Sequence, residues 1–491
     1  MAPALAHCCQ KSLEADVLIA KTGTTASDIE THGAVGARNS TNGAAVDRRL
    51  VVLPMLVSVL LLGAGTSSRA SGPPSSPSFS PSPATASYPI AARPAVRAPE
   101  VRAPAYQTPT TVFVGPPIPT STTVAPSGVW PLPAGQLHRK LAEGRTGPNP
   151  KQVAFTPNGK ELWTPLLGST GVDVFRVPDM QKIARIQLGT YGGVEVVFTK
   201  DSKRAYVSQM QTASVYEIDV DAKRLLRVLK TGGNWTKVLE LSPDELTLYA
   251  ANWVSDDISV IDLRTGALKG RIPTVDTPRG LVVSNDGKSL FVAGFENGDI
   301  VRIDLAPAVP STTSSIPVAA KNKKPPIDFT STQLLRTGGA MRHLVLDRAR
   351  NLLYADDMGH DTTHVIDLAT GQVRLLATTD SHPNTIDLSP DGHYLYVSNR
   401  GQNSPNGYNQ FGPDFGSVIV LDVATGVAVD AIVGGNQTTG LDVSPDGTLL
   451  AFTDFQDSRV QLYAIPPLAL LQTSDGTRAR SYKSELLRRK P

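Results

Sequence analysis

The feature that most constrains this chain is a repeat with a period of 42–43 residues. A short apolar run, a turn of the Ser-Pro-Asp-Gly type and a second run such as LYV recur seven times. The turns begin at residues 156, 199, 242, 284, 347, 389 and 444. Four of the six intervals are 42 or 43 residues, and the other two, of 63 and 55, contain insertions. A period of about 40–45 residues built from short strands is typical of four-stranded propeller blades.

Each unit has the residues that its turns require. Pro presets φ, Asp or Asn accepts a hydrogen bond within the turn, and Gly adopts positive φ. The third strand of most units ends in an aspartate. We interpret these residues as turn acceptors rather than metal ligands, because a tight turn needs a side-chain oxygen at that point. They are Asp219, Asp262, Asp304, Asp367 and Asp422.

The count of strands indicates how the ring closes. First, second and third strands occur seven times, but clear fourth strands follow only six units. Segment 137–144 resembles a fourth strand and precedes the first unit, so it can complete the last blade and remove an open sheet edge. Segment 468–473 competes for the same place. The predicted fold is an all-β, seven-bladed β-propeller of four-stranded antiparallel blades, closed by the N-terminal strand.

Two second strands, LYAAN (248–252) and LYVSN (395–399), stand beside SPDG-like turns and third strands such as ISVIDL (258–263). In these features the chain resembles the YVTN-type seven-bladed β-propeller repeat family over residues 137–467. Members of that family include exported bacterial proteins, surface antigens and relatives of dehydrogenase heavy chains. The resemblance implies a fold, and because the shared residues are structural it implies no catalytic residue.

The residues before the repeat have a different composition. An apolar run of 15 residues, 50–64, follows Arg48-Arg49 and is short for a membrane span. We therefore interpret residues 1–70 as a leader that carries a signal peptide or an uncleaved signal-anchor. Because this signal starts so far into the chain, one hypothesis is that the gene model is over-extended by residues 1–45 and that translation begins near Val46. Residues 71–136, rich in Pro, Ser, Ala and Thr, are predicted to be a disordered linker.

Cysteine content and charge exclude several functions. The two cysteines are Cys8 and Cys9, so the repeat region has no disulfide, zinc–thiolate site or cysteine nucleophile. Residues 137–465 contain 32 basic and 36 acidic side chains, which argues against nucleic acid as a partner. Residues 468–491 form a basic tail, which we expect to be solvated.

The loops that join strands two and three share one face of a propeller with the loops between blades, and function usually lies there. On that face we expect Trp235, Trp253, Arg279, Arg342, His343, Asp356, Asp357, His360, His382, Asn399, Arg400, Asp454 and Asp457. The candidate ligand-binding residues are His343, Asp357, His360, His382, Arg342, Arg400, Trp253 and Tyr408.

Blades five and six hold the densest polar set. His343, His360 and His382 with Asp357 could form a metal or acid–base cluster, but their spacing matches no metal motif, so no metal and no cofactor are predicted. Two insertions, 306–331 and 399–416, are expected to be loops. The aromatic rings of Tyr408 and Phe411 in the second suit contact with a sugar or protein.

These observations favour a non-enzymatic function. We expect an exported, monomeric scaffold in the periplasm, at the cell surface or secreted, which binds a protein, peptide or glycan of the cell envelope on its loop face. Membrane attachment is expected only through an uncleaved signal-anchor. The alternative is an enzyme or enzyme subunit, either a lactonase-like hydrolase or one similar to an amine-dehydrogenase heavy chain, that uses the His/Asp cluster.

Overall fold

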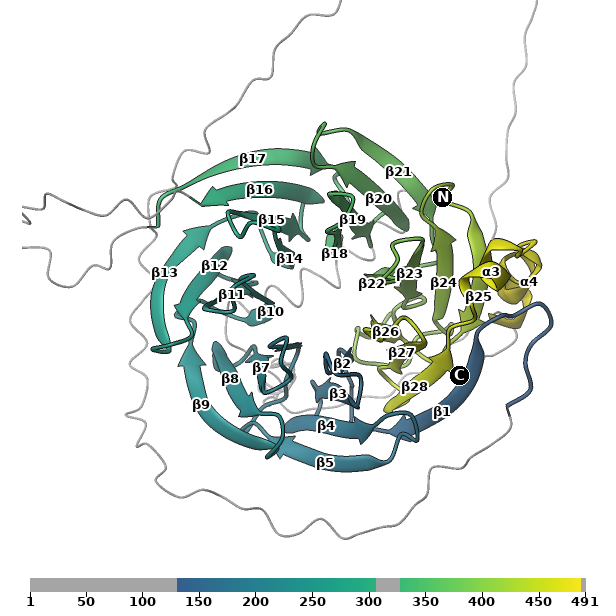
Figure 1. Ribbon diagram of the computed structural model, residues 1–491, viewed down its shortest axis with the longest axis horizontal. Helices are drawn as coiled ribbons and strands as arrows, with labels where there is room; N and C mark the ends of the chain where they lie inside the picture. The colour runs from purple at the N-terminus through teal and green to yellow at the C-terminus, as the bar shows by residue number, and fades with distance from the viewer. Residues whose placement is uncertain (1–129, 306–326, 487–491) are drawn as a thin grey trace, which may run out of the picture. The chain divides into compact units, whose positions relative to one another are not determined.

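Seven four-stranded antiparallel sheets surround a central channel in the computed structural model, which describes residues 130–305 and 327–486 (Figure 1). The leader and linker predictions at 1–129, and most of the first insertion, lie outside the described residues. The predicted propeller with an N-terminal closing strand is confirmed.

Within blades 1 to 3 the four strands follow one another in chain order, from the inner strand at the channel to the outer strand. Blade 1 consists of β2 (Ala154–Phe155), β3 (Glu161–Leu166), β4 (Gly171–Arg176) and β5 (Lys182–Gln187). Blade 2 consists of β6 (Val196–Phe198), β7 (Arg204–Gln209), β8 (Ser214–Asp219) and β9 (Arg224–Lys230). Blade 3 consists of β10 (Thr236–Leu241), β11 (Thr247–Asn252), β12 (Asp257–Asp262) and β13 (Ala267–Pro273).

Blades 4 to 6 repeat this order. Blade 4 consists of β14 (Pro278–Val283), β15 (Ser289–Gly294), β16 (Asp299–Leu305) and β17 (Phe329–Arg336). Blade 5 consists of β18 (Met341–Asp347), β19 (Leu352–Asp357), β20 (Thr362–Asp367) and β21 (Val373–Thr378). Blade 6 consists of β22 (Pro383–Leu388), β23 (Tyr394–Asn399), β24 (Ser417–Asp422) and β25 (Ala428–Val433).

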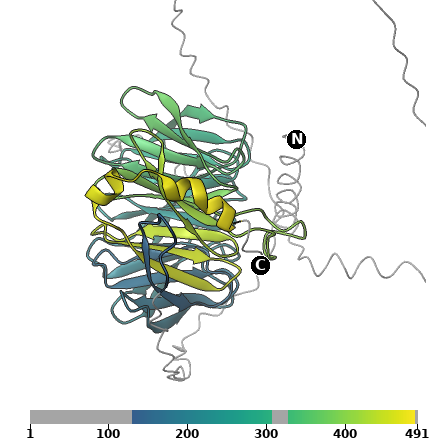
Figure 2. The same cartoon turned by 90° about the vertical axis from the view of Figure 1, so that its right-hand side faces the viewer.

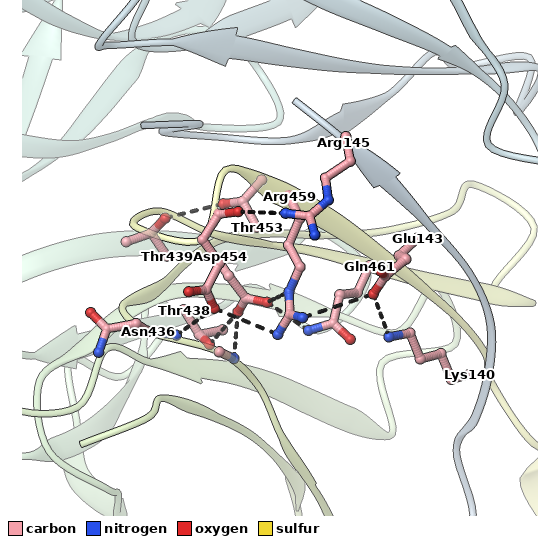
Figure 3. Close-up of polar contacts among 12 residues, drawn as sticks. Lys140, Glu143, Arg145, Asn436, Thr438, Thr439, Thr453, Asp454, Arg459 and Gln461 are labelled. Carbon is pink, nitrogen blue, oxygen red and sulfur yellow. Dashed lines mark hydrogen bonds and ion pairs between the residues drawn. The ribbon is translucent and has the colours of Figure 1, made fainter. Parts of the chain in front are cut away.

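Blade 7 closes the ring with strands from both ends of the described chain. It consists of β26 (Thr438–Val443), β27 (Leu449–Asp454), β28 (Arg459–Ala464) and β1 (Arg139–Arg145). Arg459 joins the two ends, with Nε 2.6 Å from the buried Asp454 and Nη1 3.9 Å from Glu143 of β1 (Figure 3). Lys140, on β1 itself, pairs with the same Glu143 at 2.7 Å. The contact between Arg459 and Glu143 therefore adds to the strand pairing that joins β1 to β28.

The turns form as their residues predict. Ser242, Ser389 and Ser444 each donate through Oγ to the aspartate two residues later, at 2.5 to 2.6 Å. Asp262 and Asp422, which end third strands, accept backbone N–H groups of the following turn. Apolar clusters lie between neighbouring sheets; one, for example, unites Tyr249 and Val260 of blade 3 with Val292 of blade 4. The core is therefore continuous around the channel.

The C-terminal segment differs from the prediction. Residues 468–473 do not form a strand; α3 (Leu468–Gln472) and α4 (Thr477–Leu486) pack on the outside of blade 6 (Figure 2). The expectation of a solvated tail is wrong up to residue 486, because Leu471, Arg478 and Tyr482 are buried. Tyr482 donates to Asp380 at 2.6 Å. Neither helix is long and apolar enough to cross a membrane.

Candidate functional site

The inner strands place one repeated position at the mouth of the channel. This position lies five residues before the start of each repeat turn, and in blades 1, 3, 4 and 5 it holds a cation: Lys151, Lys237, Arg279 and Arg342. Three of these residues are the second residue of β10, β14 and β18. Since equivalent strands surround one axis, four long basic side chains converge there.

A cavity of about 110 Å³ lies at this mouth. Arg400 and His382 of blade 6 and Tyr408 of the following insertion also line it, and none of the described residues lining it is an aspartate or glutamate. Its lining residues are Lys151, Leu167, Val194, Met210, Trp235, Lys237, Trp253, Arg279, Phe295, Ala340, Arg342, Met358, Gly359, His382, Arg400, Asn403 and Tyr408. We call this cavity the mouth cavity.

Aromatic rings form one wall of the mouth cavity. The ring centroids of Trp235 and Phe295 lie 5.7 Å and 6.3 Å from that of Trp253. Lys237 Nζ lies over the Trp253 ring, 2.9 Å from its centroid, and Arg279 Cζ lies 5.3 Å from it. The faces of aromatic rings attract cations, so this wall holds the basic groups in place while presenting an apolar surface.

The insertion after β23 forms the opposite side. Arg400 donates through Nη2 to Tyr408 O at 2.8 Å and to Gln437 Oε1 at 2.6 Å. Asn436, fully buried, exchanges two hydrogen bonds with the backbone of Gly412 at 2.9 and 3.0 Å. These bonds fix the insertion against blade 7, so Tyr408 has a defined position at the mouth.

The mouth cavity is strongly cationic. Burial, with Arg279 and Arg400 nearby, lowers the pKa of Arg342 well below its usual value. Burial and Arg400 lower the pKa of His382 to about 4, so its imidazole is neutral near pH 7. An anion bound at the mouth would relieve the repulsion among the three guanidinium groups.

A second, smaller cavity of about 30 Å³ shares four lining residues with the mouth cavity; we call it the inner cavity. Glu195, which precedes β6, lines it, and burial raises the pKa of Glu195 to about 8 against the opposing effect of Arg279 and Arg342. The residues lining it are Lys151, Gln152, Val194, Glu195, Val238, Arg279, Arg342, His343, Asn384 and Thr385.

The structure separates the eight candidate residues named from the sequence into three groups. Trp253, Arg342, His382, Arg400 and Tyr408 line the mouth cavity. His343 lines the inner cavity, and burial lowers its pKa to about 4.

Asp357 and His360 line neither cavity. Asp357 is fully buried and accepts the backbone N–H groups of Ala340 and Gly359 and the Thr337 hydroxyl, so it stabilises the blade 4–5 connection. His360 Nδ1 lies 2.9 Å from the same carboxylate. The part of the chain that the structure describes contains no group of three or more His, Cys, Asp or Glu side chains that could hold a metal ion. The proposed His/Asp cluster therefore does not form.

Several lining residues were not among the candidates. Lys151, Lys237 and Glu195 were overlooked, and Arg279 was placed on the loop face without being chosen. The sequence held the signal that could have found the cations, since all four stand at one register of the repeat. Phe295 and Met358 carry the same kind of signal, since each stands eleven residues after the start of its repeat turn, the register that also holds Trp253 and Arg400.

Comparison with known proteins places the chain among its relatives. It is 34% identical over 334 residues to the protein named antigen Lp49 of Leptospira interrogans, covering 67% of this chain and 70% of that protein. The chain belongs to the antigen Lp49 family. A family model described as "Lactonase, 7-bladed beta-propeller" matches residues 133–309 of the present chain. Membership of the YVTN repeat family stays a prediction.

Two more distant similarities accompany this relationship. A protein named 6-phosphogluconolactonase from an Enterobacter species is 24% identical over 185 residues, and the chain spans about half (55%) of its length. The solved structure of hydrazine synthase from Kuenenia stuttgartiensis superposes with a TM-score of 0.53 at 18% identity, over 65% of this chain and 97% of that one. This last similarity concerns the fold alone.

Proposed function

We propose that the mouth cavity binds a small organic anion, a carboxylate or phosphate attached to a ring or other compact apolar portion. The observation that carries the proposal is the set of five cations that line the cavity, Lys151, Lys237, Arg279, Arg342 and Arg400, without a lining carboxylate. Hydrogen bonds from charged donors to carboxylate or phosphate are the strongest that side chains offer.

The size and walls of the cavity limit the ligand. A volume of about 110 Å³ is below that of an engineered apolar cavity of ~150 Å³ that accepts benzene, so the cavity admits at most one ring-sized group of the ligand. Trp235, Phe295 and Met358 line the cavity and offer it apolar contacts. Lys237 and Arg279, which lie over the ring of Trp253, then face the charged group of the ligand.

The comparisons support this class of ligand. The name of the Enterobacter relative specifies a phosphorylated sugar lactone, which combines a ring with an anionic group. The lactonase family model covers residues 133–309, and this range contains Lys151, Lys237 and Arg279. The name antigen Lp49 specifies no ligand.

Calorimetric titration of the full chain with matched ligands tests the proposal. We expect phenyl phosphate and benzoate to bind at least ten times more tightly than phenol and benzyl alcohol, which lack the charge. We also expect the affinity for the anions to fall as salt rises from 50 to 500 mM, because salt screens the attraction that draws an anion from solution to the cationic mouth. Equal affinity for charged and neutral members of each pair would contradict the proposal.

The exposed ring of Phe411 favours a second function, contact with a protein or glycan of the cell envelope. Phe411 is 57% exposed although the neighbouring Gly412 is hydrogen-bonded to Asn436, so the ring is presented on a fixed segment. We expect F411S to lose binding on an array of envelope glycans while anion binding stays unchanged. Equal array signals for F411S and the unchanged chain would contradict this function.

We also propose that the protein is exported, on the basis of the apolar run 50–64, which lies outside the described residues. Mass spectrometry of the mature N-terminus tests this proposal. If the signal is cleaved, the mature protein should begin after residue 64. Detection of a peptide from residues 11–38 in the purified protein would contradict cleavage.

A further inference from the structure

We propose that the C-terminal helix α4 positions the blade 6 side of the mouth cavity, and that Tyr482 does so through Asp380. Neither α3 nor α4 contributes a described residue to the lining of either cavity. Tyr482 is therefore a positioning residue, which acts on a ligand through other side chains. The inference rests on the proposed function, since it concerns the same cavity, and goes beyond it by giving the C-terminal segment a role in binding.

Asp380 lies where three parts of the chain meet. It belongs to the connection between β21 and β22, and only 10% of its side chain is exposed. Its Oδ2 accepts hydrogen bonds from the Tyr482 hydroxyl at 2.6 Å and from Ser417 Oγ at 2.5 Å. Lys483 Nζ of α4 lies 3.4 Å from its Oδ1. One carboxylate therefore links α4 to the blade 5–6 connection and to the first residue of β24.

Ser417 in turn holds the base of the insertion that borders the mouth cavity. Residues 400–416 run between Asn399, the last residue of β23, and Ser417. Asn399 Nδ2 donates to Ser417 Oγ at 3.3 Å, and the one hydrogen that a hydroxyl can donate goes to Asp380. Asp380 thereby orients the hydroxyl that joins the two ends of the insertion. The residues of the insertion that line the mouth cavity are Arg400, Asn403 and Tyr408.

The blade 5–6 connection leads from Asp380 to the same cavity. Ser381 Oγ lies 2.7 Å from Nδ1 of His382, which lines the mouth cavity. The backbone carbonyls of Ser381 and His382 accept the N–H groups of Gly401 and Arg400, at 3.1 and 3.0 Å. The connection and the start of the insertion are thus one hydrogen-bonded unit that includes Asp380. A shift of Asp380 should therefore move both.

Helix α4 packs against β25 (Figure 1) and is anchored there independently of the Tyr482 hydroxyl. Arg478 is buried and donates through Nε to the carbonyl oxygen of Ala431 in β25 at 3.0 Å. Tyr482 itself belongs to the apolar cluster that includes Leu376 of β21. Because these contacts remain when the hydroxyl is removed, Y482F should keep α4 in place and break only its hydrogen bond to Asp380.

Two measurements on the full chain test the inference: calorimetric titration with benzoate, and hydrogen exchange of residues 400–416 without ligand. We expect Y482F to bind benzoate about fivefold more weakly, because it loses a hydrogen bond to a charged group whose effect reaches the cavity indirectly. The amides of residues 400–416 should exchange faster, since the insertion loses part of its support. Y463F should change neither measurement. It is the matched control, because Tyr463 is also buried and donates to a side chain, Gln461 at 3.2 Å, but lines neither cavity.

The path through Asp380 is tested by S417A and by the double variant Y482F/S417A. S417A removes the other hydroxyl that donates to Asp380 and leaves α4 unchanged, so it should weaken benzoate binding to a similar extent. Substitutions that act through a shared partner are not additive. The double variant should therefore bind benzoate as the weaker of the two single variants does. S417A also keeps the inference testable if Y482F does not fold.

The outcomes separate this inference from the proposed function. If folded Y482F and S417A match Y463F in benzoate affinity and in exchange, the inference is wrong. Faster exchange with unchanged affinity would also overturn it, and additive losses in the double variant would contradict the path through Asp380. If the unchanged chain binds neither benzoate nor phenyl phosphate, the proposed function fails, and the exchange of residues 400–416 alone decides whether α4 positions the insertion.

Discussion

The buried carboxylate of Asp430 holds Leu137 and His138, the two residues that lead into the closing strand β1. Its Oδ2 accepts the backbone N–H groups of Leu137 and His138 at 2.9 Å each and lies 2.6 Å from His138 Nδ1. Both Asp430 and His138 are fully buried, and His138 Nε2 lies 3.3 Å from Tyr396 OH. Because water cannot replace Asp430, these donors would lose their partner if the carboxylate were removed.

We therefore expect D430A to lower the free energy of unfolding by about 3 kcal/mol, as for other broken buried pairs. Urea denaturation of the full chain measures this change. D221A is the matched control, since Asp221 forms an exposed pair with Lys203 that adds little to stability. Equal losses for the two variants would show that Asp430 does not hold the closing strand.

Stability should fall as pH rises from 6.5 to 8. Burial raises the pKa of Glu195 to about 8 and the pKa values of Glu240 and Asp356 to about 7. The folded state therefore binds more protons than the unfolded state in this range, so each group contributes stability at low pH that is lost as pH rises through its folded pKa. His343 and His382, whose pKa values are lowered to about 4, oppose this trend only below about 6.5.

Unfolding free energies from urea denaturation at pH 6.5 and 8 check this prediction. E240Q keeps an acceptor for the backbone N–H of Val283 but cannot titrate, so its loss between the two pH values should be smaller by about 1 kcal/mol. A rise in stability across this range, or the same slope in E240Q, would contradict the assignment.

For single residues, the sequence predicts structural roles in the turns better than it predicts which side chains lie together at a site. The third-strand aspartates were correctly predicted to be turn acceptors, because their spacing repeats with the turn. The three histidines were grouped because they are close in the sequence, but they lie in different surroundings. The cations at the mouth are separated by 42 or more residues, and only an alignment to the turn reveals that they share one register.

At the level of elements, β26 must approach blade 1 closely to close the ring. A Cβ on Gly440 would lie 2.6 Å from Gln152 Cα and 2.8 Å from Val153 N, which are backbone atoms that cannot turn aside. The equivalent Gly280 of blade 4 is less crowded, since its Cβ would meet the side chains of Ala293 and Leu344 at 3.0 Å. The closing contact therefore tolerates a side chain less well than an ordinary contact between blades.

We expect G440A to lower the free energy of unfolding by about 1–3 kcal/mol, the usual range for overpacking, and by more than G280A. Thermal and urea unfolding of the two variants measure the difference. If G280A were the more destabilised of the pair, the close approach of β26 to β2 would not limit ring closure.

The blades could be predicted because each repeats the same turn residues, but the C-terminal helices could not. Residues 468–472, LALLQ, combine strong helix formers with an apolar pattern that also suits a short strand. The closing blade already has β1 as its outer strand, so the segment forms α3 instead. The basic residues of α4 suggested solvation, yet Arg478 is buried and donates to Ala431 O at 3.0 Å.

At the level of the whole molecule, the channel changes character along its length. Three residues beyond the register of the cations, the inner strands β10, β22 and β26 carry Glu240, Asp387 and Asp442. Asp387 accepts the Val443 N–H of the next blade at 2.8 Å, and Asp442 accepts that of Phe155 at 2.6 Å. The carboxylates of Asp387 and Asp442 thus join neighbouring blades, whereas the cations of the other register line the mouth cavity.

Calorimetric titration of the full chain with benzoate, carried out on K237M and on K288M, tests the central claim most directly. K237M removes one charge at the mouth and keeps most of the side-chain stem, whereas K288M removes an exposed charge from a repeat turn. Losing one charged hydrogen bond, about 1.5–3 kcal/mol, predicts at least tenfold weaker binding by K237M and unchanged binding by K288M. Equal affinities for the two variants would contradict an anion site at the mouth of the channel.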